Sequence, residues 1–339
     1  EKSVNLQTAN GRPAVFPKNS SIKKIITPSA NMNQFKGILY GIATSITFGL
    51  IPLFTLPLMQ RGMQFSSILF YRFLFATIAL GIMLKVRKQT FSIERADLPV
   101  LILLGLLYTG SALFLLMGYS YMGAGVATTI HFTYPVFVTL LMLLFFHERT
   151  PLLTWLAIVL AIFGVAKLSL HGSELTLSPT GIGIVLLSAV CYASYIVIVN
   201  RSRVRDMNSR KLAFYVFIVS SLLFLLNAVC APEGLQPPTT GGMSSVVLIA
   251  LLAVVPTVVS NITLVQAVHR IGGTMTSILG ALEPVTAVSI GVLIFQEPFT
   301  LSEATGIGLI ILAVIFIILN KQVQGKLSTV LRRIRPRHS

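Results

Sequence analysis

The most evident deficit of this sequence is electrical charge. Only 11% of its 339 residues are charged, whereas a soluble globular chain has about 25%. Its two cysteines, Cys191 and Cys230, lie inside apolar runs, so they provide neither a disulfide framework nor the spacing of a metal site. The chain is also 54% hydrophobic. These values exclude a soluble enzyme, a disordered chain and a disulfide-stabilised scaffold.

Acidic residues are the scarcest charged type. The chain has 26 Lys and Arg against 10 Asp and Glu, which gives a formal net charge of +16. A basic excess is also typical of nucleic-acid-binding proteins, but here the basic residues cluster at the ends of apolar runs. In that position they act as topology signals of a membrane protein, and no nucleic-acid partner is expected.

What the sequence does contain is a series of apolar runs, each long enough to cross a bilayer as a helix of about 20 residues. They predict an all-α polytopic membrane protein with ten transmembrane helices. The predicted spans are Phe35–Gln60, Ser66–Leu84, Leu98–Tyr119, Val126–Phe146, Leu152–Leu170, Thr180–Val199, Leu212–Cys230, Ser244–Val265, Thr274–Phe295 and Ser302–Asn320.

These spans divide the chain into regions and set its orientation. The regions are a polar N-terminal tail (1–34), a first five-helix unit (35–170), a second five-helix unit (180–320) and a basic tail (321–339). The sequence after Met32 is typical of a bacterial translation start, which raises the alternative that the preceding residues are not native. Apart from Arg72 inside a span, only Arg61 and Lys167 fall outside if both termini are cytoplasmic. The positive-inside rule therefore predicts a multi-pass protein of the inner (plasma) membrane with both termini cytoplasmic.

The two halves of the chain repeat. The aligned pairs are Gly37–Gly49 with Gly181–Ala193, Leu69–Phe73 with Ala213–Phe217, and Tyr134–Val136 with Glu283–Val285. Because each half has an odd number of spans, the second copy must enter the membrane inverted. The loops agree, since the linker Lys85–Asp97 is basic and its counterpart Ala231–Gly242 has no Lys or Arg. Two inverted five-helix repeats are typical of secondary transporters, which bind substrate near the bilayer midplane between the repeats.

Two blocks of sequence resemble a known family. They are TYPVFVTLLMLLFFHERTPLLTWLAIVLAIFGV and LEPVTAVSIGVLIFQEPFTLSEATGIGLIILAV, preceded by GYSYMGAGVATT and AVHRIGGTMTSI. Over residues 35–320 the chain resembles the drug/metabolite transporter superfamily, in its EamA-like branch. The resemblance implies a central cavity surrounded by the first four spans of each half, with the fifth and tenth at the periphery. It also implies export of small metabolites such as amino acids.

Glu283 is the leading candidate for a substrate-binding and proton-coupling residue. A charge within hydrocarbon is costly, so an ionisable group at that depth needs a reason. Glu283 lies inside its predicted span and directly precedes Pro284, whose missing N–H leaves a backbone carbonyl without its helical partner. A carboxyl group beside such a carbonyl can accept a cation or a proton. The alternative is a Glu283 that caps or cross-links helices and never titrates.

His131 is the second candidate for substrate binding and proton coupling. It lies one helical turn before Pro135 in the repeat-equivalent span, and an imidazole ordinarily titrates near neutral pH. Gly280 occupies the equivalent place in the other half. The alternative is an imidazole that is simply hydrogen-bonded to a neighbouring carbonyl. A pairing of His131 with Glu283 across the pseudo-twofold axis is a further hypothesis.

Other polar and aromatic residues are weaker candidates for substrate contact. Arg72 lies near the outer end of its span, where an interfacial or ion-pair role is favoured over substrate binding. Asn261 and Gln266, on the eighth span, can hydrogen-bond to substrate, although bonds between helices are the commoner use of such groups. The aromatic candidates are Tyr119, Tyr192 and Phe48, of which the last two are repeat-equivalent.

These observations favour a secondary transporter that exports amino acids or related amphiphilic metabolites by alternating access. The alternative is a proton-coupled exporter of cationic drugs, with Glu283 as counter-ion. A membrane-embedded enzyme is disfavoured, because His147-Glu148 is not followed by a second His at the spacing of a zinc protease. No catalytic residue, metal or cofactor is predicted. The expected partners are a small-molecule substrate and the lipid bilayer, while coupling to protons and a homodimer stay open.

Overall fold

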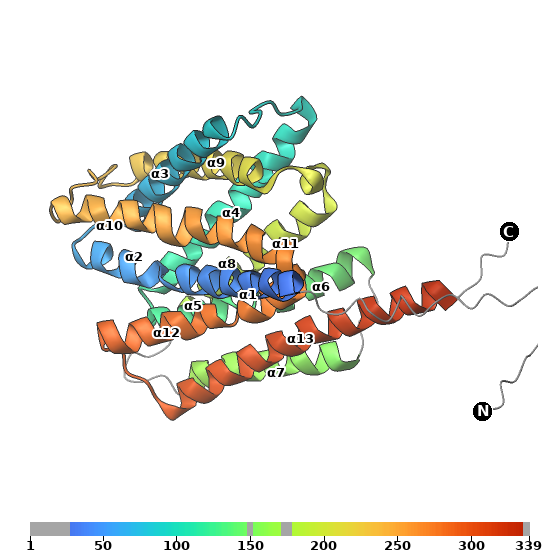
Figure 1. Cartoon of the computed structure of the whole chain (residues 1–339). Coiled ribbons are helices and arrows are strands. Elements are labelled where there is room, and N and C mark those ends of the chain that lie inside the picture. The colour runs from blue at the N-terminus through green and yellow to red at the C-terminus, as the bar shows by residue number, and fades with distance from the viewer. Residues whose placement is uncertain (1–27, 148–151, 171–177, 335–339) are drawn as a thin grey trace, which may run out of the picture.

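In the computed structural model, residues 28–147, 152–170 and 178–334 are described, and every regular element within these ranges is a helix. A helix satisfies its own backbone hydrogen bonds, which a bilayer demands of any segment that crosses it. The α-helices are α1 (Pro28–Gly49), α2 (Ile51–Gln60), α3 (Phe65–Val86), α4 (Leu98–Gly118), α5 (Ala124–His131), α6 (Tyr134–Phe146), α7 (Leu152–Leu170), α8 (Pro179–Arg201), α9 (Ser209–Cys230), α10 (Met243–Ala253), α11 (Ser260–Leu279), α12 (Leu282–Phe295) and α13 (Leu301–Ile334). Short turns η1 (Arg95–Asp97) and η2 (Arg203–Asp206) and a π-helical segment η3 (Val254–Val259) complete the chain (Figure 1).

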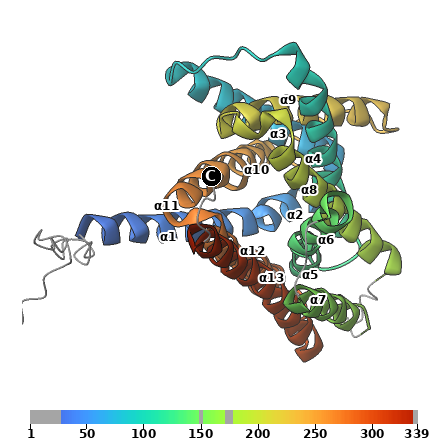
Figure 2. The ribbon, with the colours of Figure 1, turned by 90° about the vertical axis from the view of Figure 1, so that its right-hand side faces the viewer.

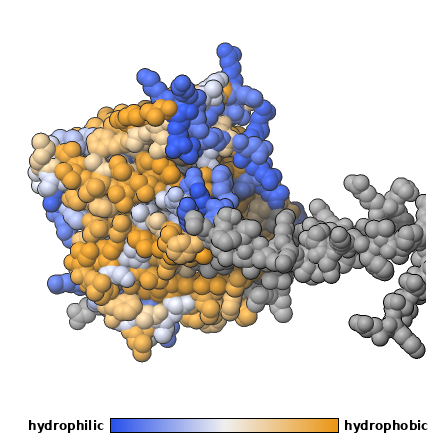
Figure 3. Space-filling model, viewed as in Figure 1, coloured by the Kyte–Doolittle hydropathy of each residue, from blue (hydrophilic) through white to orange (hydrophobic). Residues whose placement is uncertain are grey.

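Within the described ranges, seven helical segments are long and apolar enough to cross a membrane. Three shorter apolar segments, Trp155–Val165, Leu282–Phe295 and Leu301–Phe316, lie where the fifth, ninth and tenth spans were predicted. Figure 3, viewed from the same side as Figure 1, shows hydrophobic residues over most of the visible face of the helical body. Hydrophilic residues gather toward one end of it. Large side chains such as Phe145 and Leu293 are exposed, as a lipid-facing surface requires. The chain is therefore a polytopic helical membrane protein.

The two terminal helices extend beyond the predicted spans. Helix α1 begins at Pro28, within the predicted polar tail, and α13 continues to Ile334, within the predicted basic tail. Lys and Gln, which follow Asn320, have high helix propensity, and no proline occurs after that residue until Pro336. Apolar character therefore marks where a membrane span ends, but it does not mark where the helix ends.

The eighth and ninth predicted spans meet inside one helix, α11. The predicted end at Val265 was wrong, because the eighth span runs to Ile271. Thr44 of α1 contacts Thr263, Gly37 lies against Ile271, and Gly41 lies against Leu279. From Thr263 to Ile271, α11 therefore runs toward the start of α1, and by Leu279 it has turned back toward the end of α1. The chain reverses direction between Ile271 and Leu279.

Four spans are interrupted near prolines. The interruptions fall between α1 and α2, between α5 and α6, at η3, and between α11 and α12; the prolines are Pro52, Pro135, Pro256 and Pro284. Each proline removes an amide donor from its helix. In η3, the hydroxyl of Thr257 donates to the carbonyl of Leu252 at 3.0 Å and so satisfies the group that Pro256 leaves free.

Helix contacts occur in matched sets. Helix α1 packs on α11 and α12, and α8, at the equivalent place in the second half, packs on α4 and α6. Helix α3 packs on α9, α5 on α12, and α7 on α13. Figures 1 and 2 show α7 and α13 side by side at the edge of the body. The Tyr71 hydroxyl donates to the carbonyl of Gln236 at 3.0 Å, and its counterpart Tyr215 donates to the carbonyl of Phe91.

Helices α3 and α9, which are equivalent in the two halves, run in opposite directions. Ser66 at the start of α3 is hydrogen-bonded to Asn227 near the end of α9. At the other end of the pair, Gly81 of α3 lies against Phe214 of α9. Helices α3 and α9 therefore enter the helical body from opposite ends.

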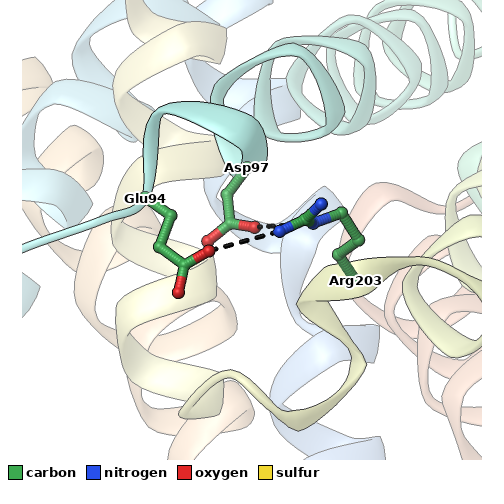
Figure 4. Close-up of polar contacts among 3 residues, drawn as sticks. All are labelled: Glu94, Asp97 and Arg203. Atoms are coloured by element: carbon green, nitrogen blue, oxygen red, sulfur yellow. Dashed lines mark hydrogen bonds and ion pairs between the residues drawn. The ribbon is translucent and has the colours of Figure 1, made fainter.

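At the basic end of the body, ion pairs join η2 to the segment between α3 and α4. The guanidinium of Arg203 lies 3.2 Å from Glu94 and 3.8 Å from Asp97 (Figure 4). At the opposite end, Glu297 accepts hydrogen bonds from the amides of Ala124 and Gly125, at 2.8 and 3.5 Å. That carboxylate caps the N-terminus of α5, where the unpaired amides of a helix favour negative charge.

We predict that Gly125→Ala destabilises the fold. A Cβ atom at Gly125 would lie 2.7 Å from the backbone Cα of Val288, so α5 and α12 would have to separate. Overpacking of this kind costs about 1–3 kcal/mol. Thermal unfolding in detergent should show a lower midpoint for this variant.

The matched control is Gly183→Ala, because a Cβ atom there meets nothing within 4 Å. Its midpoint should be unchanged or slightly higher, since Ala is the better helix former. Equal midpoints for the two variants would contradict the close approach of α5 and α12.

Candidate functional site

Most of the predicted site residues meet in one central cavity. Its volume is about 60 Å³, room for roughly four water molecules. The lining residues are Phe48, Ile51, Arg72, Phe73, Tyr108, Ser111, Ala112, Leu115, His131, Tyr134, Tyr192 and Glu283. Both halves of the chain contribute to this wall, and five of its members were predicted from the sequence: Phe48, Arg72, His131, Tyr192 and Glu283.

The interrupted helices bring the polar groups to this cavity. His131 is the last residue of α5, and Glu283 is the second residue of α12. Each therefore lies at the break of its span, one turn before Pro135 or directly before Pro284, where the regular hydrogen bonding of the helix stops. Tyr134 occupies the repeat-equivalent place of Glu283 and also lines the cavity. The same backbone feature thus presents a phenol from one half and a carboxyl from the other.

Arg72 forms a fixed cationic part of the wall. Its side chain is only 4% exposed, so it does not reach out to the membrane interface. Its Nε atom donates to the hydroxyl of Thr257 at 3.0 Å, and its guanidinium carbon lies 5.3 Å from the ring centre of Phe73. Within the described ranges of the chain, Arg72 has no carboxylate within ion-pair distance. Its remaining N–H donors are therefore available to a ligand in the cavity.

Glu283 supplies an anionic group to the same wall. Its side chain is half-buried, and among the described residues no hydrogen bond or ion pair to its carboxylate is found. The predicted pairing of Glu283 with His131 is not observed there either, although both line the cavity. The imidazole of His131 instead has its Nδ1 atom 2.9 Å from the hydroxyl of Ser188. The partner of His131 is thus a side-chain hydroxyl, whereas the alternative drawn from the sequence expected a neighbouring carbonyl.

Aromatic rings close the remaining sides of the cavity. The rings of Tyr134 and Tyr192 lie 4.8 Å apart in a T-shaped arrangement, and the ring of His131 lies 5.5 Å from that of Tyr192. Tyr108 contacts Tyr192 at 6.2 Å and Phe73 at 5.8 Å. Ring faces and edges of this kind offer both apolar contact and attraction for a cation.

Sequence reasoning missed Tyr108, Ser111 and Tyr134. Tyr134 could have been found, because it precedes Pro135 as Glu283 precedes Pro284. Tyr108 and Ser111 lie on one face of α4, together with Ala112 and Leu115, at the spacing that places residues on one side of a helix. Packing against α8 and α9 determines which face of α4 points toward the cavity. The sequence of α4 is mostly apolar on all sides, so it does not predict that face.

Three predicted residues lie outside this cavity wall. The Tyr119 hydroxyl is 3.1 Å from that of Thr128. The Asn261 amide donates to the carbonyl of Thr257 at 2.6 Å. The Gln266 side chain accepts from Arg270, whose guanidinium lies over the ring of Tyr40. Each of these groups already has a protein partner.

A larger cavity of about 590 Å³ lies at the basic end of the body, between the loop after α3 and the loop after α8. Arg203, which lines it, is paired with Glu94 and Asp97, and the cavity lies at the ends of the spans and not within them. No group of His, Cys, Asp or Glu in the described residues is arranged to hold a metal ion. The central cavity is therefore the stronger site for a substrate within the membrane.

The chain is similar in sequence to proteins that are named as uncharacterized transporters. A transporter of Synechocystis sp. is 27% identical over 197 residues, which cover 56% of this chain and 57% of that protein. The Bacillus subtilis transporter YdfC is 25% identical over 239 residues, 70% of this chain and 76% of that protein. A transporter of Archaeoglobus fulgidus is 23% identical over 282 residues, 83% of this chain and 98% of that protein.

A known crystal structure has the same fold, with a TM-score of 0.59 at 17% sequence identity, over 84% of this chain and 97% of that one. The family model of the EamA-like transporters matches the chain twice, over residues 35–170 and 179–319. Two successive matches account for most of the chain, which confirms the resemblance seen in its sequence. The chain belongs to the EamA-like transporter family.

Proposed function

We propose that this protein is a secondary transporter that exports small zwitterionic metabolites, with amino acids as the main class. One observation carries the proposal: a guanidinium, Arg72, and a carboxyl group, Glu283, line the same small aromatic cavity. Membership of a transporter family supports transport itself, and the chemistry of this wall supports the class of substrate.

A zwitterion complements this wall at both of its charged groups. A carboxylate is the preferred partner of a guanidinium, to which it forms charge-assisted hydrogen bonds. An ammonium group suits Glu283 and the ring faces of Tyr134 and Tyr192. A buried charge is costly unless it is paired, so a ligand that pairs both at once gains more than one that pairs a single charge.

A cationic drug fits this wall less well. Glu283 would serve as its counter-ion, but Arg72 would repel it within the same cavity. We therefore rank proton-coupled export of cationic drugs as the second candidate.

We further propose that ten spans form two inverted five-helix repeats that rock about the cavity to expose it to each side in turn. Support comes from the two successive family matches, the matched helix contacts and the opposite directions of α3 and α9. A binding site between inverted repeats stays fixed while the repeats exchange conformations. Because one chain supplies the whole cavity wall, transport does not need a homodimer.

We assign proton coupling to Glu283, as the carboxyl group that lines the cavity, with export of substrate in exchange for protons. We place both termini and the basic loops after α3 and α8 in the cytoplasm of a cell bounded by this inner membrane. The excess of Lys and Arg at that end of the body supports the orientation.

Transport by purified protein tests the substrate class. Liposomes would be loaded with a mixed pool of amino acids and lipophilic cations, and efflux would be followed by mass spectrometry. We expect selective loss of a few amino acids. Arg72→Gln should slow that loss about 10- to 100-fold, because a hydrogen bond to a charged group contributes about 1.5–3 kcal/mol.

Arg87→Gln, the same substitution at an exposed arginine after α3, is the matched control and should leave efflux unchanged. Movement of lipophilic cations without amino acids would overturn the zwitterion proposal and favour drug export.

An imposed pH gradient tests the coupling assignment. Efflux by the unaltered protein should rise when the gradient drives protons in the opposite direction to substrate. Glu283→Gln should lose this response, because an amide cannot take up the proton. Glu233→Gln, in the loop between α9 and α10, should retain it. A Glu283→Gln protein with full, pH-sensitive flux would remove this carboxyl from the coupling mechanism.

Thiol labelling tests the orientation. In a background with Cys191→Ser and Cys230→Ser, single cysteines would be introduced as Glu233→Cys and Thr90→Cys, at exposed sites on opposite ends of the body. A membrane-impermeant maleimide should label the first in intact cells and the second only after permeabilisation. The reverse pattern would show that the termini face outward.

A further inference from the structure

Behind the cavity wall lies a short chain of hydrogen bonds that the transport proposal does not use. Ser188, on α8, is fully buried, at 0% exposed. Its hydroxyl donates to the backbone carbonyl of Ser111 on α4 at 2.6 Å. The same oxygen lies 2.9 Å from Nδ1 of His131 on α5. Three helices from both halves of the chain thus meet at one hydroxyl group.

The positions of the protons in this chain follow from its donors and acceptors. A serine hydroxyl has one hydrogen to donate and lone pairs to accept. A carbonyl oxygen only accepts, so at 2.6 Å the hydrogen of Ser188 must point to Ser111. The hydroxyl oxygen is then an acceptor toward His131, and Nδ1 must carry the hydrogen. In a neutral imidazole, Nε2 is then left with a free lone pair.

We infer that Ser188 is a positioning residue that fixes His131 as the neutral Nδ1–H tautomer, and that Nε2 accepts a hydrogen bond from an N–H or O–H donor of the substrate. His131 lines the cavity, and no second partner for its ring nitrogens is found among the described residues. The inference rests on the proposed transport function and deepens it, since it assigns this ring to recognition of a donor group.

The groups around the imidazole make this acceptor specific. The rings of Tyr134 and Tyr192 lie next to it, and the charged members of the same wall are Arg72 and Glu283. Arg72 offers only donors, whereas Nε2 of His131 and an ionised Glu283 offer only acceptors. A primary ammonium has several N–H donors to share between two acceptors. A quaternary ammonium has none, so this wall selects against it.

The repeat-equivalent position in the other half of the chain shows which contacts of Ser188 occur in both halves. Thr44 is the repeat-equivalent of Ser188. Its hydroxyl donates to that of Thr263 at 2.6 Å and lies 3.3 Å from the carbonyl of Ser260, the carbonyl that corresponds to that of Ser111. Gly280 replaces His131 there, so no ring can use the threonine oxygen. The approach of hydroxyl to carbonyl joins helices in both halves, and the tautomer function is specific to Ser188. Thr44 also shows that threonine fits such a place.

Nuclear magnetic resonance of protein labelled with ¹³C and ¹⁵N in histidine, in lipid nanodiscs, tests the tautomer. The signals of His131 are those that disappear in His131→Gln. We expect the chemical shifts of an Nδ1–H imidazole in the unaltered protein. Ser188→Ala should shift His131 toward the Nε2–H form, Ser188→Thr should preserve Nδ1–H, and the matched control Thr44→Ala should change nothing. An Nε2–H ring or an imidazolium in the unaltered protein, or no shift in Ser188→Ala, would overturn the inference.

A pair of probes tests the acceptor function. L-alanine and its N,N,N-trimethyl derivative share a carboxylate and a positive nitrogen, but only alanine has N–H donors. The unaltered protein in liposomes should export alanine in preference. Ser188→Ala should reduce the preference for alanine about two- to tenfold, because the lost hydrogen bond between Ser188 and His131 joins two neutral groups. Ser188→Thr should restore the preference. An unchanged preference would overturn the acceptor function.

The two readouts separate this inference from the function on which it rests. The resonance measurement needs no substrate, so an unexpected tautomer would leave the proposed transport function intact. An unaltered protein that exports no amino acid at all would overturn the proposed function while the tautomer of His131 stood as measured.

Discussion

Two ionisable groups that line one cavity, the buried Arg72 and the half-buried Glu283, constrain much of the rest of this structure. A charged group at the centre of a bilayer costs about 2.5–3.5 kcal/mol on insertion scales, so Arg72 and Glu283 must face inward. Arg72 is held there by the hydroxyl of Thr257, which in turn satisfies the carbonyl that Pro256 leaves free. The hydroxyl of Thr257 therefore links the π-helical segment to the arginine that lines the cavity.

The same constraint explains why the helices around the cavity are broken. A regular helix uses all its amides and carbonyls internally and has none to offer a ligand. An interrupted helix has unpaired backbone groups, which a membrane tolerates only where they line a cavity or meet a neighbouring helix. His131 and Glu283 both lie at such breaks. Close approaches elsewhere, such as Gly125 against Val288, hold the broken pieces in register.

The sequence indicated the class of fold and the main cavity residues because both leave local signals. Apolar runs of spanning length marked the helices, and a Glu-Pro or an unpaired polar group within them marked His131 and Glu283. The repeat related Phe48 to Tyr192, and both line the cavity. The family blocks, confirmed by the two matches to the EamA-like model, added the expectation of a central cavity.

What the sequence did not reveal depends on the rotation of helices about their own axes. Asn261 and Gln266 are polar within an apolar span, yet their side chains bond within that same span. Tyr108 looked no different from other aromatic residues, yet it faces inward. In a uniformly apolar span, no amphipathic pattern tells the inward face from the lipid face.

In the proposed transporter, repeat-equivalent positions carry unlike side chains, and this difference fixes the orientation in which a substrate binds. The halves place equivalent backbone around the cavity, but Tyr134 stands opposite Glu283, Val216 is the counterpart of Arg72, and Gly280 that of His131. If both halves presented the same groups, a zwitterion could bind in two opposite orientations of equal energy. With donors at Arg72 and acceptors at Glu283 and His131, only one orientation pairs both charges. In the proposed mechanism, equivalent backbone would let the site open to either side, and unlike side chains would keep the substrate in one orientation throughout.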